Sequence, residues 1–245
     1  MQTTDKSNFL RAEAELALDE ARKVKAEKTK DLGQPIKLAG IALDIHIKDQ
    51  FAWIAENTQV VRKVDLESGK TVQLFRGHTA PVTCLAFYEK IAGSSKRKFV
   101  ISGSWDKVCS FLPLKTKELV SSTPAHADFL KVLLVIPALH LLVSSSSDKI
   151  VQFWDLSSLE AGKPLASAGS ISAHTRPVEA ITAKTEGDVA VLYTADTMGI
   201  IKVWELVKED SKPTRWRAVQ KDELYYHRTK INEILYGHGQ IWTGV

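Results

Sequence analysis

The stretch LHLLVSSSSDKIVQFWDL, residues 139–156, decides the fold of this chain. It contains two short runs rich in leucine and β-branched residues, Leu139–Val143 and Ile150–Trp154, with a Ser/Asp/Lys corner between them. Short apolar runs bounded by such residues are typical of two strands joined by a tight turn. Ser and Asp suit the turn because their side chains bond nearby backbone N–H groups. The stretch therefore predicts a β-hairpin that ends in the pair Trp154-Asp155.

The hairpin recurs along the chain at a nearly fixed spacing. Four histidines, each followed by an apolar run, lie 48, 48 and 53 residues apart: His78, His126, His174 and His227. After each His we expect strands a, b and c, and then a more polar strand d that leads to the next His. The expected strands a, b and c are 82–87, 99–103 and 108–112; 130–135, 141–144 and 150–154; 178–181, 189–194 and 200–204; and, for a and b alone, 231–235 and 241–243.

Short motifs inside these units resemble those of the WD-repeat (WD40) family. Arg76-Gly77-His78 resembles the Gly-His that opens a WD repeat, and 102–106 resembles the end of its strand b. Trp154-Asp155 and Trp204-Glu205 resemble the dipeptide that ends strand c. The whole run 151–245 is also similar to an uncharacterised group of fungal WD-repeat proteins. The resemblance covers nearly all of the chain beyond its N-terminal segment.

The resemblance implies an all-β propeller in which each repeat supplies one four-stranded blade. The repeats would occupy about 35–77, 78–125, 126–173, 174–226 and, in part, 227–245, after a helix and linker at 1–34. They are longer than usual for the family, and we expect the extra residues in surface loops such as 92–98 and 208–214.

The two ends of this series depart from the family pattern. The first repeat, with expected strands 41–46, 51–55, 60–64 and 71–75, has Val64-Asp65 in place of Trp-Asp. The last repeat stops at Gly244-Val245, after strand b. Four blades and a partial fifth do not close a ring, and unpaired strand edges favour aggregation. We therefore expect an open or truncated ring, with Ile36–Leu38 pairing with a final blade in a longer parent chain.

The resemblance also implies a hydrogen-bonded tetrad of His, Ser or Thr, Asp and Trp within a repeat. In the third repeat its members would be His126, Ser144, Asp148 and Trp154. A buried Asp needs a partner and a buried indole N–H needs an acceptor, and a His between them serves both. The second repeat has Leu112 in place of the Trp, and in the fourth Met198 occupies the Asp position, with Asp196 two residues away. The full tetrad is therefore expected only in the third repeat.

No motif indicates catalysis, a metal or a cofactor. The chain has no Gly-x-Ser-x-Gly, no phosphate-cradling Gly loop and no Cys/His cluster, and one His per blade does not converge on a metal. Cys84 and Cys109 lie in apolar runs, which predicts buried free thiols and a reducing compartment. The net charge of +4 is mild, and no apolar segment is long enough to span a membrane. We expect a non-enzymatic protein of the cytoplasm or nucleus.

The N-terminal segment predicts a helix from about Phe9 to Lys30, because strong helix formers dominate it. Ser7 or Asn8 could cap its start. One face carries residues spaced by three and four, most of them alanine. This helix is expected either to lie exposed on the main domain or to pair with a partner helix.

The resemblance implies a scaffold for protein–protein interaction. In the family the preferred docking face is formed by the d–a and b–c loops. The residues expected there are Thr79, Trp105, Lys107, Asp128, Phe129, Lys149, Arg176, Thr197, Arg228 and Lys230. Trp105 and Phe129 would be its aromatic anchors, although either side chain could instead pack between blades.

Two other functions stay open. Lys96-Arg97-Lys98 in an a–b loop and Arg215-Trp216-Arg217 on a strand d allow RNA binding within a ribonucleoprotein, although a solvated loop and an edge strand explain both. The other is substrate recruitment for ubiquitin ligation. That adaptor type usually has an Arg two residues after Trp-Asp, where this chain has Ser157 and Val207. Glu179 and Glu186 are expected to be surface carboxylates.

Overall fold

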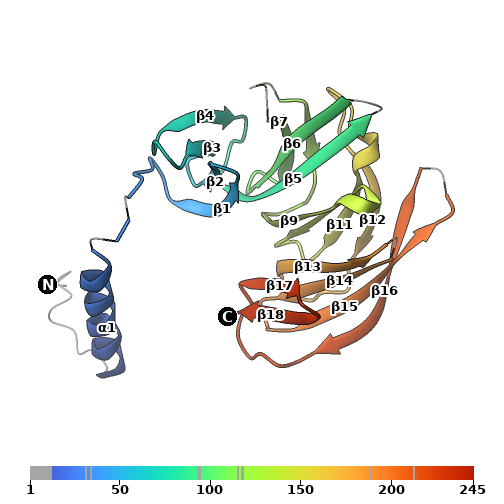
Figure 1. Ribbon diagram of the computed structural model, residues 1–245. Coiled ribbons are helices and arrows are strands. Elements are labelled where there is room, and N and C mark those ends of the chain that lie inside the picture. The colour runs from blue at the N-terminus through green and yellow to red at the C-terminus, as the bar shows by residue number, and fades with distance from the viewer. Residues whose placement is uncertain are drawn as a thin grey trace, which may run out of the picture. The chain divides into compact units, whose positions relative to one another are not determined.

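The computed structural model describes residues 13–30, 32–33, 35–92, 95–114, 116, 119–187, 189–211 and 213–245. The chain divides into a first unit that ends at Lys37 and a second unit, Leu38–Val245 (Figure 1). The first unit contains helix α1, Glu13–Thr29, none of whose residues is buried. The predicted helix start and its candidate caps Ser7 and Asn8 lie outside the described residues. Pairing of this helix with a partner helix stays a prediction.

The second unit consists of five consecutive antiparallel sheets (Figure 1). Blade 1 comprises β1 (Ala42–Lys48), β2 (Phe51–Glu56), β3 (Val60–Asp65) and β4 (Thr71–Arg76); blade 2 comprises β5 (Val82–Ala92), β6 (Ser95–Ser104), β7 (Val108–Pro113) and β8 (Ser121–Pro124). Blade 3 comprises β9 (Leu130–Ile136), β10 (Leu141–Ser146), β11 (Val151–Asp155) and β12 (Ala166–Ile171); blade 4 comprises β13 (Val178–Glu186), β14 (Val189–Asp196), β15 (Ile201–Glu209) and β16 (Arg215–Leu224). Blade 5 has β17 (Glu233–Gly237) and β18 (Gln240–Gly244). The predicted fold of four blades and a partial fifth is confirmed.

Neighbouring blades are held together by apolar clusters between their faces. One cluster joins blades 1 and 2, one joins blades 2 and 3, one joins blades 3 and 4, and a smaller one joins blades 4 and 5. Hydrogen bonds between first strands add to this: Leu85 N–H donates to Asp44 at 2.7 Å, and Thr83 donates to the Leu130 carbonyl at 2.8 Å. These contacts give the second unit a continuous core, with loops at both ends of every blade.

The two terminal blades each expose an apolar face. Leu43, Ile45 and Ile47 alternate along β1 and are exposed, because only the other face of blade 1 has a neighbouring blade. Leu235 and Trp242 are exposed on blade 5 in the same way. Ile36–Leu38, predicted to be an outer strand, has no strand partner among the described residues, and Leu38 packs on blade 1 instead.

Of the two segments predicted to be loops, 92–98 is strand in its described residues, whereas 208–214 is strand only at 208 and 209. β5 continues to Ala92 and β6 begins at Ser95, so that Lys90 pairs with Arg97 inside a long hairpin. β15 likewise continues to Glu209, and β16 begins at Arg215. Backbone ladder bonds continue beyond the core here, so polar residues extend the strands although the hydrophobic pattern has ended.

Candidate functional site

The structure brings the four tetrad residues of blade 3 together in one chain of hydrogen bonds. The Trp154 indole N–H donates to Ser144 Oγ at 2.9 Å. His126 Nε2 lies 2.8 Å from Ser144 Oγ, and its Nδ1 lies 3.0 Å from Asp148 Oδ2. An indole N–H can only donate and an ionised carboxylate can only accept, so the direction of the chain is fixed. The Ser144 hydroxyl donates to Nε2, and the proton of the neutral His126 sits on Nδ1 and points to Asp148.

The protonation state of His126 agrees with this direction. Burial lowers the pKa of His126 below its ordinary value, and the bond to Asp148 offsets this only in part. The imidazole is therefore neutral at physiological pH, with one nitrogen to accept and one to donate. Such a ring connects two strands and a turn without burying an unpaired charge.

Blade 4 contains a second complete tetrad, so the prediction that only the third repeat has one is wrong. The Trp204 indole donates to Thr194 Oγ1 at 2.8 Å, His174 Nε2 lies 2.7 Å from that oxygen, and His174 Nδ1 lies 3.4 Å from Asp196. Asp196 follows Thr194 by two residues, at the position of Ser146 in blade 3, and its Oδ1 also accepts the backbone N–H of Met198 at 2.9 Å. One carboxylate thus bonds the turn and the His, where blade 3 uses Ser146 and Asp148.

The remaining blades carry parts of the tetrad or replace it. In blade 2, His78 bonds Ser102 at 2.9 Å and Asp106 at 2.8 Å, with Leu112 in place of the Trp. Burial tends to raise the pKa of Asp106, but the bonds from His78 and the backbone outweigh it and lower that pKa. In blade 5, His227 lies 2.9 Å from Thr243.

The Asp residues of blades 2 and 3 also clamp two loops together. Asp148 accepts the backbone N–H of Ala127, in the d–a loop, at 3.0 Å and that of Ile150, after the b–c turn, at 2.9 Å. Asp106 does the same for Thr79 and Val108. In blades 1 to 4, one residue of each b–c turn has a left-handed backbone: Gln59, Lys107, Lys149 and Gly199. Each lies five residues after the corresponding position of strand b, which in blades 2 to 4 is the Ser or Thr that bonds the histidine. Sequence analysis missed this position, although its constant spacing was visible in the repeats.

These clamped loops present an exposed aromatic pair. Trp105, in the b–c turn of blade 2, stacks on Phe129, in the d–a loop of blade 3, with ring centroids 5.1 Å apart and an interplanar angle of 23°. Trp105 is 39% exposed and Phe129 is 42% exposed. The backbone N–H of Trp105 donates to the Pro81 carbonyl, and the Phe129 carbonyl accepts from the backbone N–H of Ser147. The two predicted anchors thus lie together, at the surface of the junction between blades 2 and 3.

The other residues expected on the docking face have different degrees of exposure. Thr79, Lys107, Lys149, Arg176, Arg228 and Lys230 are exposed, and Asp128 and Thr197 are half-buried. Glu179 is not an ordinary surface carboxylate, as its side chain is only 10% exposed. It bonds Lys131 of blade 3 at 3.2 Å and Lys230 of blade 5 at 3.0 Å. Lys230 is therefore partly committed to an ion pair that spans three blades.

Three further groups bear on chemistry. Among the described residues, no three His, Cys, Asp or Glu side chains are grouped so that they could hold a metal ion. Cys84 and Cys109 are unpaired and buried, and burial raises the pKa of both thiols. Trp216 is buried in the cluster between blades 3 and 4, which removes it from any base-stacking surface. No helix in the described part of the chain is long and apolar enough to cross a membrane.

Comparison with known proteins finds a match to one family of repeats. Residues 69–111 match the family described as WD domain, G-beta repeat. Such domains are generally non-catalytic and generally mediate protein–protein interactions. The matching region covers one repeat, and the four-stranded blades and the two His-Ser/Thr-Asp-Trp tetrads agree with the fold of a WD-repeat β-propeller.

Three individual proteins have similar sequences. An uncharacterised WD repeat-containing protein of Schizosaccharomyces pombe is 31% identical over 244 residues, which cover 96% of this chain and 62% of the relative. The ribosome biogenesis protein YTM1 of Scheffersomyces stipitis is 28% identical over 62% of this chain and 28% of its own length. The nuclear distribution protein PAC1 of Coccidioides posadasii is 29% identical over 44% of this chain and 26% of its own length. The chain thus spans less than two thirds of each relative.

Solved structures are similar in fold alone. The computationally designed Ika8 protein has a TM-score of 0.59 at 16% identity, over 82% of this chain and 54% of its own. The designed Ika4 protein has a TM-score of 0.55 at 18% identity, over 71% of this chain and 99% of its own.

Proposed function

We propose that this chain is a non-enzymatic scaffold of the cytoplasm or nucleus, which binds protein partners on the face formed by its d–a and b–c loops. The observation that carries the proposal is the exposed, stacked pair of Trp105 and Phe129. Aromatic side chains of this kind dominate binding energies at protein interfaces.

The pair is pre-organised for binding. The hydrogen bonds of Asp106 in blade 2 and Asp148 in blade 3 fix the loops that carry Trp105 and Phe129, so little conformational entropy is lost when a partner docks. Exposed cations lie on the same set of loops, including Lys107, Lys149 and Arg176. A partner that places an apolar side chain on the rings and acidic groups around them fits this face.

Affinity capture followed by quantitative mass spectrometry tests the proposal. The wild-type chain is compared with Trp105→Ala/Phe129→Ala and with Val189→Ala, which removes an exposed apolar side chain at the other end of the blades. We expect the double variant to lose specific partners that Val189→Ala retains, while both keep the wild-type melting temperature within a few degrees. An unchanged set of partners in the double variant would reject this face as the docking site.

RNA binding is the second candidate, and one observation favours it. The exposed Trp105 ring lies two residues from the exposed Lys107, and an aromatic platform beside a cation suits a nucleic-acid base. Similarity to a ribosome biogenesis protein agrees with this alternative. Loss of partners in high salt or after RNase treatment would support RNA, because phosphate contacts weaken steeply with salt.

A further inference from the structure

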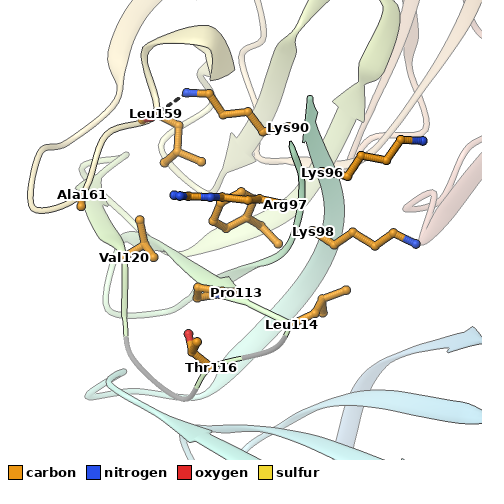
Figure 2. Close-up of a pocket in the computed structure, with 11 residues that line it drawn as sticks. Lys90, Lys96, Arg97, Lys98, Pro113, Leu114, Thr116, Val120, Leu159 and Ala161 are labelled. Carbon is orange, nitrogen blue, oxygen red and sulfur yellow. Dashed lines mark hydrogen bonds between the residues drawn. The ribbon is translucent and has the colours of Figure 1, made fainter. Parts of the chain in front are cut away.

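A groove of about 940 Å³ lies at the opposite end of the blades from the docking face. Its described walls come from Lys90 and residues 96–99 of β5 and β6, from residues 113, 114, 116 and 120, and from Leu159 and Ala161 after β11, so it lies between blades 2 and 3 (Figure 2). In an antiparallel blade, a–b and c–d connections lie at one end and b–c and d–a loops at the other. The groove is therefore a separate surface from the Trp105–Phe129 pair.

The charges in the groove are unbalanced. Arg97 extends across it toward Val120 and Ala161, while Lys96 and Lys98 extend the other way (Figure 2). This follows from strand alternation in β6, and Lys96 and Lys98 lie near Glu89, at 3.7 and 3.9 Å. None of the lining residues that the structure describes is acidic. Among the described residues, the Arg97 side chain has no hydrogen-bond or ion-pair partner.

Lys90 strengthens the positive field of the groove. It pairs with Arg97 across the hairpin, and its ammonium donates to the carbonyls of Leu159, at 2.8 Å, and Ser157, at 3.2 Å. These carbonyls hold the ammonium in place but do not neutralise it. The hairpin therefore presents a fixed cation and a free guanidinium on one face.

The floor of the groove is aliphatic. Leu159 and Phe99 belong to the core between blades 2 and 3, and Val120 packs against that core at its edge. Pro113 and Ala161 complete the apolar lining. A ligand that fits this groove combines an aliphatic side chain with a carboxylate, which a guanidinium binds through two parallel hydrogen bonds.

We propose that this groove binds an acidic peptide segment of a partner protein, with an aliphatic side chain on the floor and a carboxylate on Arg97. RNA fits less well, because Phe99, the only aromatic side chain among the described lining residues, is buried and offers no ring face for stacking. The site is distinct from the docking face and adds a second attachment point to a scaffold.

Fluorescence anisotropy with a labelled probe tests this proposal. The probe is a fluorescein-labelled peptide in which glutamates flank a Leu-Leu pair, and two controls are the same peptide with Ser-Ser in the centre and a labelled oligouridine. We expect saturable binding of the Leu-Leu peptide and at least tenfold weaker binding of both controls. No saturable binding of that peptide overturns the proposal. Tighter binding of the oligouridine, lost in Arg97→Glu, would make the groove an RNA site instead.

Matched variants assign the binding to the groove. Arg97→Glu removes the guanidinium and Ala161→Trp fills the groove without changing its charge; each should weaken peptide binding at least tenfold. Lys208→Glu, an equal charge change on an exposed residue of blade 4, and Trp105→Ala on the docking face should leave binding unchanged. If Arg97→Glu lowers the melting temperature, its loss of binding could reflect misfolding, and the result for Ala161→Trp then decides whether the peptide binds in the groove. Equal binding by Ala161→Trp and wild type would show that the peptide does not bind in the groove. The proposal for the docking face has its own test and would not be affected.

Discussion

Blades 1 and 3 have the same four-stranded topology but fasten strand b to strand c in different ways. Blade 3 uses the hydrogen-bonded chain Trp154–Ser144–His126–Asp148. Blade 1 has a fully buried carboxylate, Glu56, at the end of β2, and it accepts hydrogen bonds from Arg62 on β3 and from Thr58 in the turn. The blade therefore requires a satisfied polar connection at this point, but it does not require one particular set of residues.

The hydrogen bonds of blade 3 and the ion pair of blade 1 hold different parts of the structure, so removal of one residue should have different consequences in the two blades. The blade 3 chain also bonds the d–a loop, through Ala127, so it shapes the surface that we propose for docking. The blade 1 pair connects strands b and c and the turn between them, and Arg62 also donates to Thr71 on strand d at 2.9 Å, within the same blade. Damage to blade 3 should therefore reach the docking face, whereas damage to blade 1 should affect stability alone.

Trp154→Ala is expected to have the largest effect. It removes a buried ring from the core between blades 2 and 3, together with the donor to Ser144, and should cost about 3–5 kcal/mol of unfolding free energy. Trp105→Ala should cost less, because that ring is 39% exposed. Chemical denaturation of both variants measures the difference. A wild-type melting curve for Trp154→Ala would show that blade 3 does not depend on its tetrad.

Arg62→Met tests the connection in blade 1. It leaves Glu56 buried with only Thr58 as a donor, and we expect a loss of about 3 kcal/mol. Replacing both partners, as Glu56→Leu/Arg62→Met, should restore most of this, because the unpaired charge is then absent. Denaturation of the single and double variants supplies the comparison. If the double variant is the less stable of the two, the ion pair contributes more than its desolvation costs.

The tetrad of blade 4 can be converted to the arrangement of blade 3 by moving its carboxylate from position 196 to position 198. Asp196→Ser should cost roughly 1–3 kcal/mol, since His174 and the N–H groups of the turn lose their acceptor. Adding Met198→Asp rebuilds the order found at Ser146 and Asp148, and should recover most of the loss. Thermal melts of the single and double variants decide this. No recovery would mean that the b–c turn of blade 4 cannot place a carboxylate four residues after Thr194.

The same residues show how far the sequence predicts this structure. The apolar runs predicted strands a, b and c of blades 1 to 4, because alternating burial sets the register of a sheet, whereas the more polar strand d of blades 2 to 4 was expected without bounds. The tetrad of blade 4 was missed because a fixed offset from Thr194 pointed to Met198, whereas a carboxylate two residues earlier reaches His174 from the end of the strand. The stacking of Trp105 on Phe129 and the groove beside Arg97 depend on how blades 2 and 3 meet. No local pattern contains that information.

Acid should weaken blades 3 and 4 before it weakens blade 1. Burial lowers the pKa of His126 and His174, so stability is complete above the unfolded-state pKa of about 6.5 and is lost as pH falls toward the folded-state values. His46 acts in the opposite direction, because its bond to Asp44 raises its pKa. Melting temperatures should fall between about pH 7 and pH 5. His126→Gln should show a smaller fall, and an equal fall would assign the effect to other groups.

The smallest effect on stability, and the sharpest on binding, is expected for Lys149→Glu/Arg176→Glu. Both side chains are exposed on the proposed docking face, and exposed charges contribute little to the free energy of unfolding, so each change should alter it by no more than about 0.5 kcal/mol. Lys149 has a left-handed backbone, but Lys→Glu keeps a side chain of similar branching there, so the turn should persist.

Reversing two positive charges at the rim should slow association with an acidic partner and make it less sensitive to salt. Partner capture, or association rates once a partner is identified, measures this alongside a melting curve. Unchanged capture would show that these two cations do not contribute to docking. A large fall in melting temperature would mean that the b–c turn of blade 3 depends on its lysine. Reduced capture with an intact fold would separate what blade 3 contributes through its surface from what it contributes through Trp154.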